Sequence, residues 1–429
     1  MTKKTVIRVV CFAVMGLLFA AVLAGNIVAS HFSDLITEYF HGAGISYEGE
    51  AVANALKYSD QLCREMTEEG IVLLENKETD GKAALPLTED EAKNINVFGW
   101  AGSDGGWIFG SDGSANSNSG TSRAKVKMLT DALSESGINY NTEIMDMYTA
   151  FRDKRAGVRA LNGDPDFYML IEPGTGAPDT EDAYSAVGKN GKTILQNAKE
   201  FSNVAIVVLG RMGGEGTDLP FKQYLNTTGK YNVGDGMPTD EKRTYLDISK
   251  YEEDLLDMVT ANFGKVIVLI NTCNSMNLNF LDRYDNIDAV MQVNGTGQSG
   301  TYAIPKVLKG EVNPSGRMTN TQPYDLTTDP TFANAGGKSA SKGYITYAED
   351  IYVGYKWYET ADAEGYWDNV SNEYGTGYDG VVQYPFGYGI SYTTFDWELV
   401  SADPAPGSAI AKETEKIIVQ VRVTNTGDV

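Results

Sequence analysis

The chain has 429 residues, of which 42% are hydrophobic and 22% charged, a composition that is ordinary for a globular protein and excludes a disordered chain. Its 58 acidic and 35 basic residues give a net charge of -23, which argues against nucleic-acid binding because Lys and Arg are needed to neutralise phosphates. The sequence has two histidines and three cysteines without CxxC spacing, so it predicts neither a metal site nor a cofactor and leaves proton transfer to carboxylates.

The N-terminal segment, residues 1–30, has the form of an export signal or a signal anchor. Lys3, Lys4 and Arg8 precede an apolar run over residues 9–29, close to the ~20 residues that span a bilayer. Basic residues before such a run place the following domain outside the cytoplasm. The sequence leaves two outcomes open: a membrane anchor through residues 9–29 with an extracellular domain, or cleavage and secretion.

Residues 48–76 are predicted to be helical and then extended. Cys63, in the helical part, could pair with Cys273, and the sequence does not decide this. Residues 94–98 are predicted as the first strand of a sheet, followed by a glycine- and serine-rich loop that lacks GK[ST] and is therefore not a P-loop. Trp107 and Phe109 in this loop either form a stacking platform for a sugar ring or pack beneath the loop.

Helices and strands then alternate. The segment 145–184 lacks a clear pattern and is predicted to be an irregular insertion. Helices are expected at 123–135, 192–201, 249–263 and 301–308, and strands near 138 and at 205–209, 265–271 and 289–293. The unbroken apolar strands are typical of a parallel sheet that is buried on both faces. We therefore predict an α/β fold, with a mostly parallel sheet and helices on both faces.

The strand at 205–209 leads into a glycine-rich loop that contains GGEGTD at 213–218. Ligands of parallel sheets bind beyond the carboxyl ends of the strands, so Glu215 is the candidate for proton transfer. The neighbouring glycines let its side chain approach a substrate. The alternative is a solvated carboxylate in a turn.

Three later segments are less specific. A GxGxxG pattern at 295–300 is expected to be a tight strand-to-helix turn, because no second strand that ends in an acidic residue follows at the spacing of a dinucleotide site. Tyrosines within 323–383 are expected to cover the edge of the sheet or to line a cleft. Residues 416–427 alternate as a half-buried strand does.

Several motifs in order resemble family 3 glycoside hydrolases, the β-glucosidase-type enzymes, and specifically their α/β-sandwich domain. They are EGIVLLEN at 69–76, GGEGTD at 213–218, GQSG at 297–300, GEVNPSGR at 310–317, IYVGYKWYET at 351–360 and YPFGYGISYTTF at 384–395. The resemblance implies an α/β-sandwich domain at 48–325, an aromatic and glycine-rich extension at 326–398, and the start of a fibronectin type III-like domain at 399–429.

The resemblance also implies retaining hydrolysis of a glycoside by two carboxylates. Glu215 matches the family's acid/base, and Asp218 would support the loop and the substrate, although Leu219 departs from the usual Arg. The nucleophile of the family is an Asp in a (β/α)8 barrel, which a permuted member would carry after Val429. We expect the 429-residue chain alone to be inactive; the alternative is a non-catalytic, surface-anchored carbohydrate-binding or scaffolding protein.

Overall fold

The computed structural model describes residues 2–31, 49–104, 106–110, 126–153, 172–174, 183–211, 223, 242–333, 347, 349–410, 416–427 and 429. It divides the chain into two compact units, Met1–Ser59 and Asp60–Val429, and the boundary falls within one helix, α3 (Glu50–Gly70).

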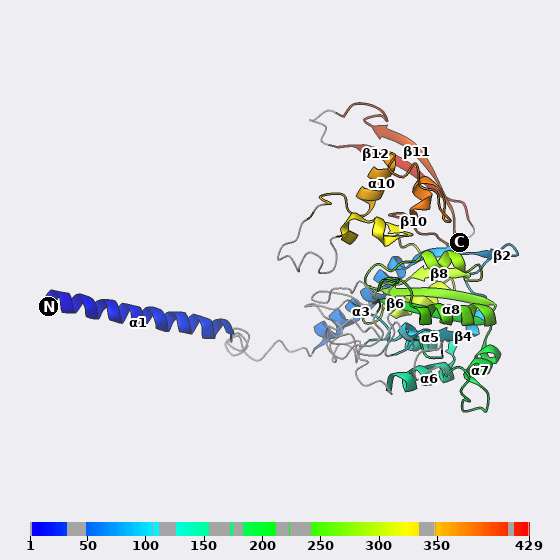
Figure 1. Ribbon diagram of the computed structural model, residues 1–429, viewed down its shortest axis with the longest axis horizontal. Coiled ribbons are helices and arrows are strands. Elements are labelled where there is room, and N and C mark those ends of the chain that lie inside the picture. Colours follow the sequence, from blue (N-terminus) through cyan, green and yellow to red (C-terminus); the bar gives the residue numbers. More distant parts are fainter. Residues whose placement is uncertain are drawn as a thin grey trace. The chain divides into compact units, whose positions relative to one another are not determined.

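The first unit contains a long apolar helix, α1 (Lys3–His31) (Figure 1). Its segment Lys3–Asn26 has a mean hydropathy of 2.6, and it is the one helix in the described residues that is long and apolar enough to cross a membrane. A signal sequence near an N-terminus has the same length and composition. The helix therefore agrees with an export signal or an anchor and does not separate the two.

The second unit is built on a six-stranded sheet with the order β1-β8-β7-β6-β4-β5 (Figure 1). The strands are β1 (Val72–Asn76), β4 (Asn94–Phe98), β5 (Asn139–Tyr140), β6 (Val204–Arg211), β7 (Lys265–Thr272) and β8 (Ala289–Gln292). All neighbouring pairs are parallel except β1, which runs antiparallel to β8. The prediction of a mostly parallel sheet is confirmed.

Helices lie between these strands in the chain, and one follows the last of them. They are α5 (Leu129–Glu135), α6 (Thr142–Asp153), α7 (Ile194–Phe201), α8 (Lys250–Asn262) and α9 (Ala303–Leu308). Because βαβ crossovers are right-handed, the step from β4 to β5 places α5 on the face opposite to α6, α7 and α8. The contacts follow this division, since α5 packs with α9 whereas α6 packs with α7.

Local sequence accounts for the start of two helices and for the centre of the core. Thr193 before α7 and Ser249 before α8 each form a capping box with a residue three positions on, Gln196 and Glu252. Every residue of β6 is buried, and so is every residue of β7 after Lys265. Burial on both faces is what the unbroken apolar runs predict.

The structure corrects four boundaries. The first strand of the sheet is β1, not residues 94–98, because the edge beside β8 accepts an antiparallel strand. The segment predicted to be irregular from 145 begins inside α6. The helix predicted from 123 begins at Leu129, where Met128 is extended, and the helix predicted from 301 starts as a 3-10 turn, η5 (Gly300–Tyr302).

Short elements complete the second unit. They are β2 (Glu78–Thr79), β3 (Lys82–Ala83), β9 (Gln322–Pro323), β10 (Val382–Tyr384) and α10 (Tyr355–Ala363). Two of them, α10 and β10, contribute to a smaller core after the sheet. Tyr358 and Trp367 are buried in the smaller core. Further on, the hydroxyl of Tyr384 donates to Glu75 and that of Tyr388 to the carbonyl of Leu74. These two tyrosines thus cover the edge strand β1.

The last described elements, β11 (Phe395–Asp403) and β12 (Ile418–Asn425), form an antiparallel hairpin. Trp397 pairs with Val423 and Leu399 with Val421, so these four side chains share one face. All four are exposed, from 46% for Val421 to 72% for Trp397. A hairpin alone does not establish a fibronectin type III-like domain, which stays a prediction.

Candidate active site

The parallel strands have the spatial order β5-β4-β6-β7-β8, in which the chain reverses its direction of winding between β4 and β6. In sheets of this kind, ligands bind outside the carboxyl ends of the strands at the point of reversal. The last residue of β6, Arg211, lies there, paired in register with Thr272 at the end of β7. The chain therefore leaves β6 at the position where a site is expected.

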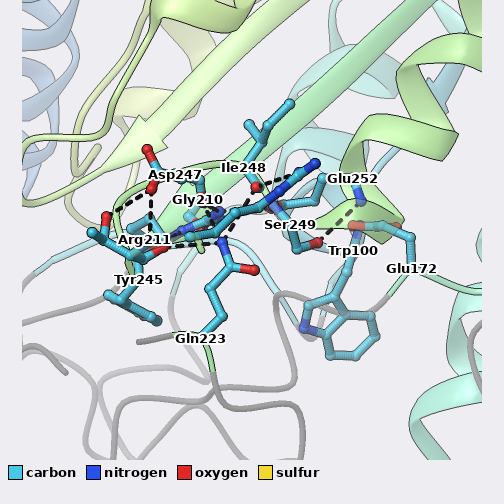
Figure 2. A network of polar contacts seen from close by, with 12 residues as sticks. Trp100, Glu172, Gly210, Arg211, Gln223, Tyr245, Asp247, Ile248, Ser249 and Glu252 are labelled. Carbon is cyan, nitrogen blue, oxygen red and sulfur yellow. Dashed lines mark hydrogen bonds and ion pairs between the residues drawn. The ribbon is translucent and has the colours of Figure 1, made fainter. Parts of the chain in front are cut away.

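Arg211 is fully buried, and all five N–H groups of its guanidinium donate hydrogen bonds (Figure 2). Nε donates to the carbonyl of Tyr245 at 2.7 Å, and the two terminal nitrogens donate to the carbonyls of Gly210 and Asp247 at 2.7 and 2.6 Å. The remaining two bonds go to Glu252, at 2.7 and 2.6 Å. This fork geometry is the strong, bidentate form of an ion pair.

Glu252 has two roles at the start of α8. Its carboxylate accepts both bonds from Arg211 and also accepts the backbone N–H of Ser249 at 2.7 Å, which completes the capping box. Burial acts to lower the pKa of Arg211, but the charge and hydrogen bonds of Glu252 outweigh it and raise that pKa above its ordinary value. The ion pair thus joins the end of β6 to the first turn of α8.

Gln223 adds a second attachment to the segment between β6 and α8. Its side-chain amide is buried and donates to the carbonyls of Thr244, Asp247 and Ile248 at 3.0, 3.0 and 3.2 Å (Figure 2). Arg211 at the start of the segment and Gln223 within it therefore bind the same stretch, residues 244–248. These contacts hold the described residues on either side of residues 212–222.

A third loop meets this network at the end of β4. Both carboxylate oxygens of Glu172 accept the backbone N–H of Trp100, at 2.8 and 3.0 Å (Figure 2). The hydroxyl of Tyr148 donates to Oε2 of Glu172 at 3.2 Å. Burial raises the pKa of Glu172 well above its ordinary value, against the opposing effect of the Trp100 hydrogen bonds. Glu172 is thus attached to the backbone at the end of β4.

The loop after β4 packs onto the ends of β7 and β8. The side chain of Asn271 accepts the N–H of Ile108 at 2.7 Å and donates to its carbonyl at 2.8 Å. The indole of Trp107 donates to the hydroxyl of Thr296 at 3.0 Å. Gly297 has φ +62° and donates its N–H to the carbonyl of Phe109, so the GxGxxG turn serves close packing of this loop.

A cavity of about 610 Å³ opens at the carboxyl ends of β7 and β8 and the start of β1. Its wall includes Thr272, the pairing partner of Arg211, and the segment 316–322. Cys273 also contributes to the wall, and burial raises the pKa of its thiol to about 11. This thiol is therefore protonated at neutral pH and is not poised as a nucleophile.

The predicted site residues divide into two groups. Glu215 and Asp218 lie outside the described residues, so their roles stay predictions. Trp107 and Phe109 are described, and each is 1% exposed, which matches the alternative in which they pack beneath the loop; their binding of substrate stays a prediction. Within the described ranges, no group of three or more His, Cys, Asp or Glu side chains is placed to hold a metal ion.

Sequence reasoning missed Arg211, Glu252 and Asn271. Two signals were present. SKYE at 249–252 matches the S/T-x-x-E pattern of a capping box, which marks both the start of α8 and Glu252. An Arg that ends an unbroken apolar run must be buried or leave the sheet, but nothing in the sequence identifies its partner 41 residues later.

Fold and site together define a doubly wound α/β domain whose loops converge at the carboxyl edge of the sheet. The family model of the "Glycosyl hydrolase family 3 C-terminal domain" matches residues 71–355. The chain belongs to glycosyl hydrolase family 3.

Curated relatives and solved structures agree with this assignment. The chain is 28% identical over 304 residues to a beta-glucosidase of Ruminococcus albus, covering 71% of this chain and 25% of that protein. It is 31% identical over 247 residues to beta-glucosidase A of Butyrivibrio fibrisolvens, covering 55% and 28%. The structure of a beta-glucosidase from Paenibacillus barengoltzii matches with a TM-score of 0.59 and 26% identity, covering 86% of this chain and 33% of that one. The chain thus spans about a quarter of the length of these curated relatives.

Proposed function

We propose that this chain supplies the acid/base half of a retaining β-glycosidase, with Glu215 as the proton donor and acceptor. The nucleophile is an Asp of a barrel domain outside these 429 residues, in a protein with permuted domain order. The substrate is a β-linked glucoside or a related glycoside. Membership of the family and the beta-glucosidase relatives support the reaction class.

The proposed mechanism has two steps. In the first, the Asp attacks the anomeric carbon while Glu215 protonates the oxygen of the leaving group, which gives a covalent glycosyl-enzyme. In the second, Glu215 removes a proton from water, and the water displaces the Asp from the anomeric carbon. The two carboxyl groups of a retaining enzyme lie about 5–5.5 Å apart, so the barrel must approach the carboxyl edge of the sheet.

The observation that carries the proposal is the position of Arg211, the last described residue before the segment that contains Glu215. Arg211 is held at the point of reversal of the sheet by five hydrogen bonds. A chain extends by at most about 3.3–3.6 Å per residue. Glu215 follows Arg211 by four residues, so it is within about 14 Å of Arg211. The ion pair with Glu252 and the contacts of Gln223 offer the anchoring that Leu219 cannot supply in place of an Arg.

Glu215→Gln in a protein that contains both the chain and its barrel tests the role of Glu215. We expect turnover of an aryl β-glucoside with a poor leaving group to fall by at least about 100-fold, the lower range of a general acid's contribution. Azide should restore part of the turnover of an activated substrate, because that substrate needs no acid. Full activity of Glu215→Gln would overturn the assignment. The 429-residue chain alone should show no turnover.

A second function remains as the alternative, namely a non-catalytic, surface-anchored carbohydrate-binding or scaffolding protein of the same fold. Glu215→Gln separates the two, since a binding protein would keep its affinity and show no activity to lose. Residues 9–29 either anchor the protein with its domain outside the cell or are removed on secretion. N-terminal sequencing of the exported protein decides between these outcomes.

A further inference from the structure

The cavity beside β7 and β8 has two oppositely charged residues in its wall, Glu69 and Arg317. Both residues are exposed, so a ligand that enters the cavity can reach them. Another part of the wall is apolar and includes Ile270, Leu278 and Met318. The volume of about 610 Å³ falls within the range of small-molecule pockets, roughly 300–1,000 Å³. None of these residues has a part in the proposed acid/base step.

The guanidinium of Arg317 is oriented by hydrogen bonds on one side only. Its Nη1 donates to the carbonyls of Ser315 and Gly316, at 3.2 and 2.8 Å. The other two nitrogens, Nε and Nη2, have no acceptor in the described part of the chain. These two nitrogens share one edge of the guanidinium, and such an edge binds both oxygens of a carboxylate. Arg317 is therefore a prepared partner for a carboxylate.

The carboxylate of Glu69 also lacks a partner among the residues that the structure describes. Its segment touches that of Arg317. Gly316 donates its N–H to the carbonyl of Ile71 at 3.1 Å, and a Cβ on Gly316 would lie 2.7 Å from the carbonyl oxygen of Gly70. Glu69 precedes this contact and Arg317 follows it, yet these two described residues form no ion pair with each other. The two charges thus belong to adjoining parts of the wall and are both available to a ligand.

Two opposite charges that line one cavity without pairing narrow the class of ligand. An uncharged ligand would take water from both charges and replace it at neither, which is unfavourable. An anion is disfavoured by the net charge of -23. A quaternary ammonium group prefers aromatic faces, and none of the described residues in the wall is aromatic. A small zwitterion with a primary ammonium group and a carboxylate fits best.

We propose that this cavity binds a free α-amino acid with an apolar side chain. The carboxylate of the ligand accepts hydrogen bonds from Nε and Nη2 of Arg317, and its ammonium group donates to the carboxylate of Glu69. The side chain of the ligand contacts the apolar part of the wall. This ligand is distinct from the glycoside, so the proposal does not rest on the proposed function.

Binding is tested on the full 429-residue chain in an uncharged detergent, by calorimetry and by saturation-transfer NMR. Leucine is compared with N-acetylleucine, which lacks the ammonium group, and with leucinamide, which lacks the carboxylate. We expect a dissociation constant on the order of 1 mM for leucine. Each analogue should bind at least about tenfold more weakly, because each loses a hydrogen bond between charged groups. Hydrogen exchange should show that leucine protects residues 270–276 and 316–322 and leaves residues 194–201 unchanged.

Two variants assign the ends of the ligand to the two charges. Arg317→Gln should weaken leucine binding at least about tenfold and leave leucinamide binding unchanged, because leucinamide has no carboxylate. Glu69→Gln should weaken leucine binding similarly and leave N-acetylleucine binding unchanged. The matched control is Glu65→Gln, which changes an exposed carboxylate of the same helix outside the wall and should bind leucine as the wild type does.

Several results would overturn the proposal: leucine that binds no more tightly than either analogue, protection only outside the two segments, or an equal loss of affinity in Glu65→Gln and Glu69→Gln. Should a variant fail to fold, the analogues and the protection map of the wild type still decide the matter, because they need no substitution. Failure here leaves the acid/base role untouched, because that role is read from turnover by Glu215→Gln.

Discussion

Glu252→Gln is expected to destabilise the second unit strongly. The substitution keeps the size of the side chain but removes the charge that faces Arg211, and both side chains are buried, with exposures of 0% and 1%. One of the two oxygens that accept from the guanidinium becomes an NH2 group, which cannot accept. Removing one partner of a buried ion pair costs about 3–5 kcal/mol, a large share of the roughly 5–15 kcal/mol that stabilises a domain.

Urea unfolding of the full chain, followed by tryptophan fluorescence, measures this loss. With a slope of about 3 kcal/mol/M, a loss of about 4 kcal/mol lowers the midpoint by roughly 1.3 M. The matched control is Asp254→Asn on the same helix, whose ion pair with Lys250 at 2.6 Å is partly exposed, at 31% for Asp254 and 67% for Lys250. It should change the free energy of unfolding by no more than about 0.5 kcal/mol.

The double variant Arg211→Met with Glu252→Met tests the reason for the loss. Removing both charges leaves no unpaired buried ion, so much of the stability should return. The reasoning would be refuted if Glu252→Gln shifted the midpoint no further than Asp254→Asn. It would also be refuted if the double variant lost more free energy of unfolding than Arg211→Met and Glu252→Met lose when their separate losses are added.

Two further predictions concern the end of β4. Glu172 has a pKa in the folded protein above its ordinary value of 4.5, so the stability that it contributes is complete below that value and falls as pH rises toward the folded pKa. Glu172→Gln should remove this dependence of the free energy of unfolding on pH, whose slope reaches at most about 1.4 kcal/mol per pH unit. Urea titrations of the wild type and the variant between about pH 5 and about pH 7 measure the slope. The same slope in both proteins would contradict the prediction. Gly99→Ala should cost more than Gly137→Ala in thermal unfolding. Both glycines have positive φ, at +90° and +79°, but only at Gly99 would the new Cβ meet a backbone atom, the Val208 carbonyl oxygen at 2.2 Å. Equal losses of thermal stability in the two variants would show that the contact with the Val208 carbonyl oxygen does not destabilise Gly99→Ala.

The sheet was largely predictable from sequence because its strands are buried on both faces. The runs at 205–209 and 265–271 contain no polar interruption, and the structure extends them to β6 and β7. The role of β1 was less accessible. Its residues read as extended, but the pattern of one strand does not show that it joins an existing sheet as an antiparallel edge.

The buried polar contacts could not be predicted from the sequence, for a different reason. Asn271 looks like an ordinary polar residue at the end of a strand, yet its amide binds the loop at Ile108, 163 residues away in sequence. Arg211 and Glu252 are likewise brought together by the crossover through α8. Periodicity reports which face of an element is buried; it does not report which buried polar groups will meet.

The hairpin of β11 and β12 has a practical consequence. One face of the hairpin exposes four apolar side chains to water, those of Trp397, Leu399, Val421 and Val423. Exposed apolar surface on a two-stranded sheet promotes association between molecules. Concentrated samples of this polypeptide will therefore tend to cloud or sediment, and sulfate, which strengthens apolar burial, will aggravate the effect. Dilute samples at low sulfate are the appropriate starting material for every measurement described above.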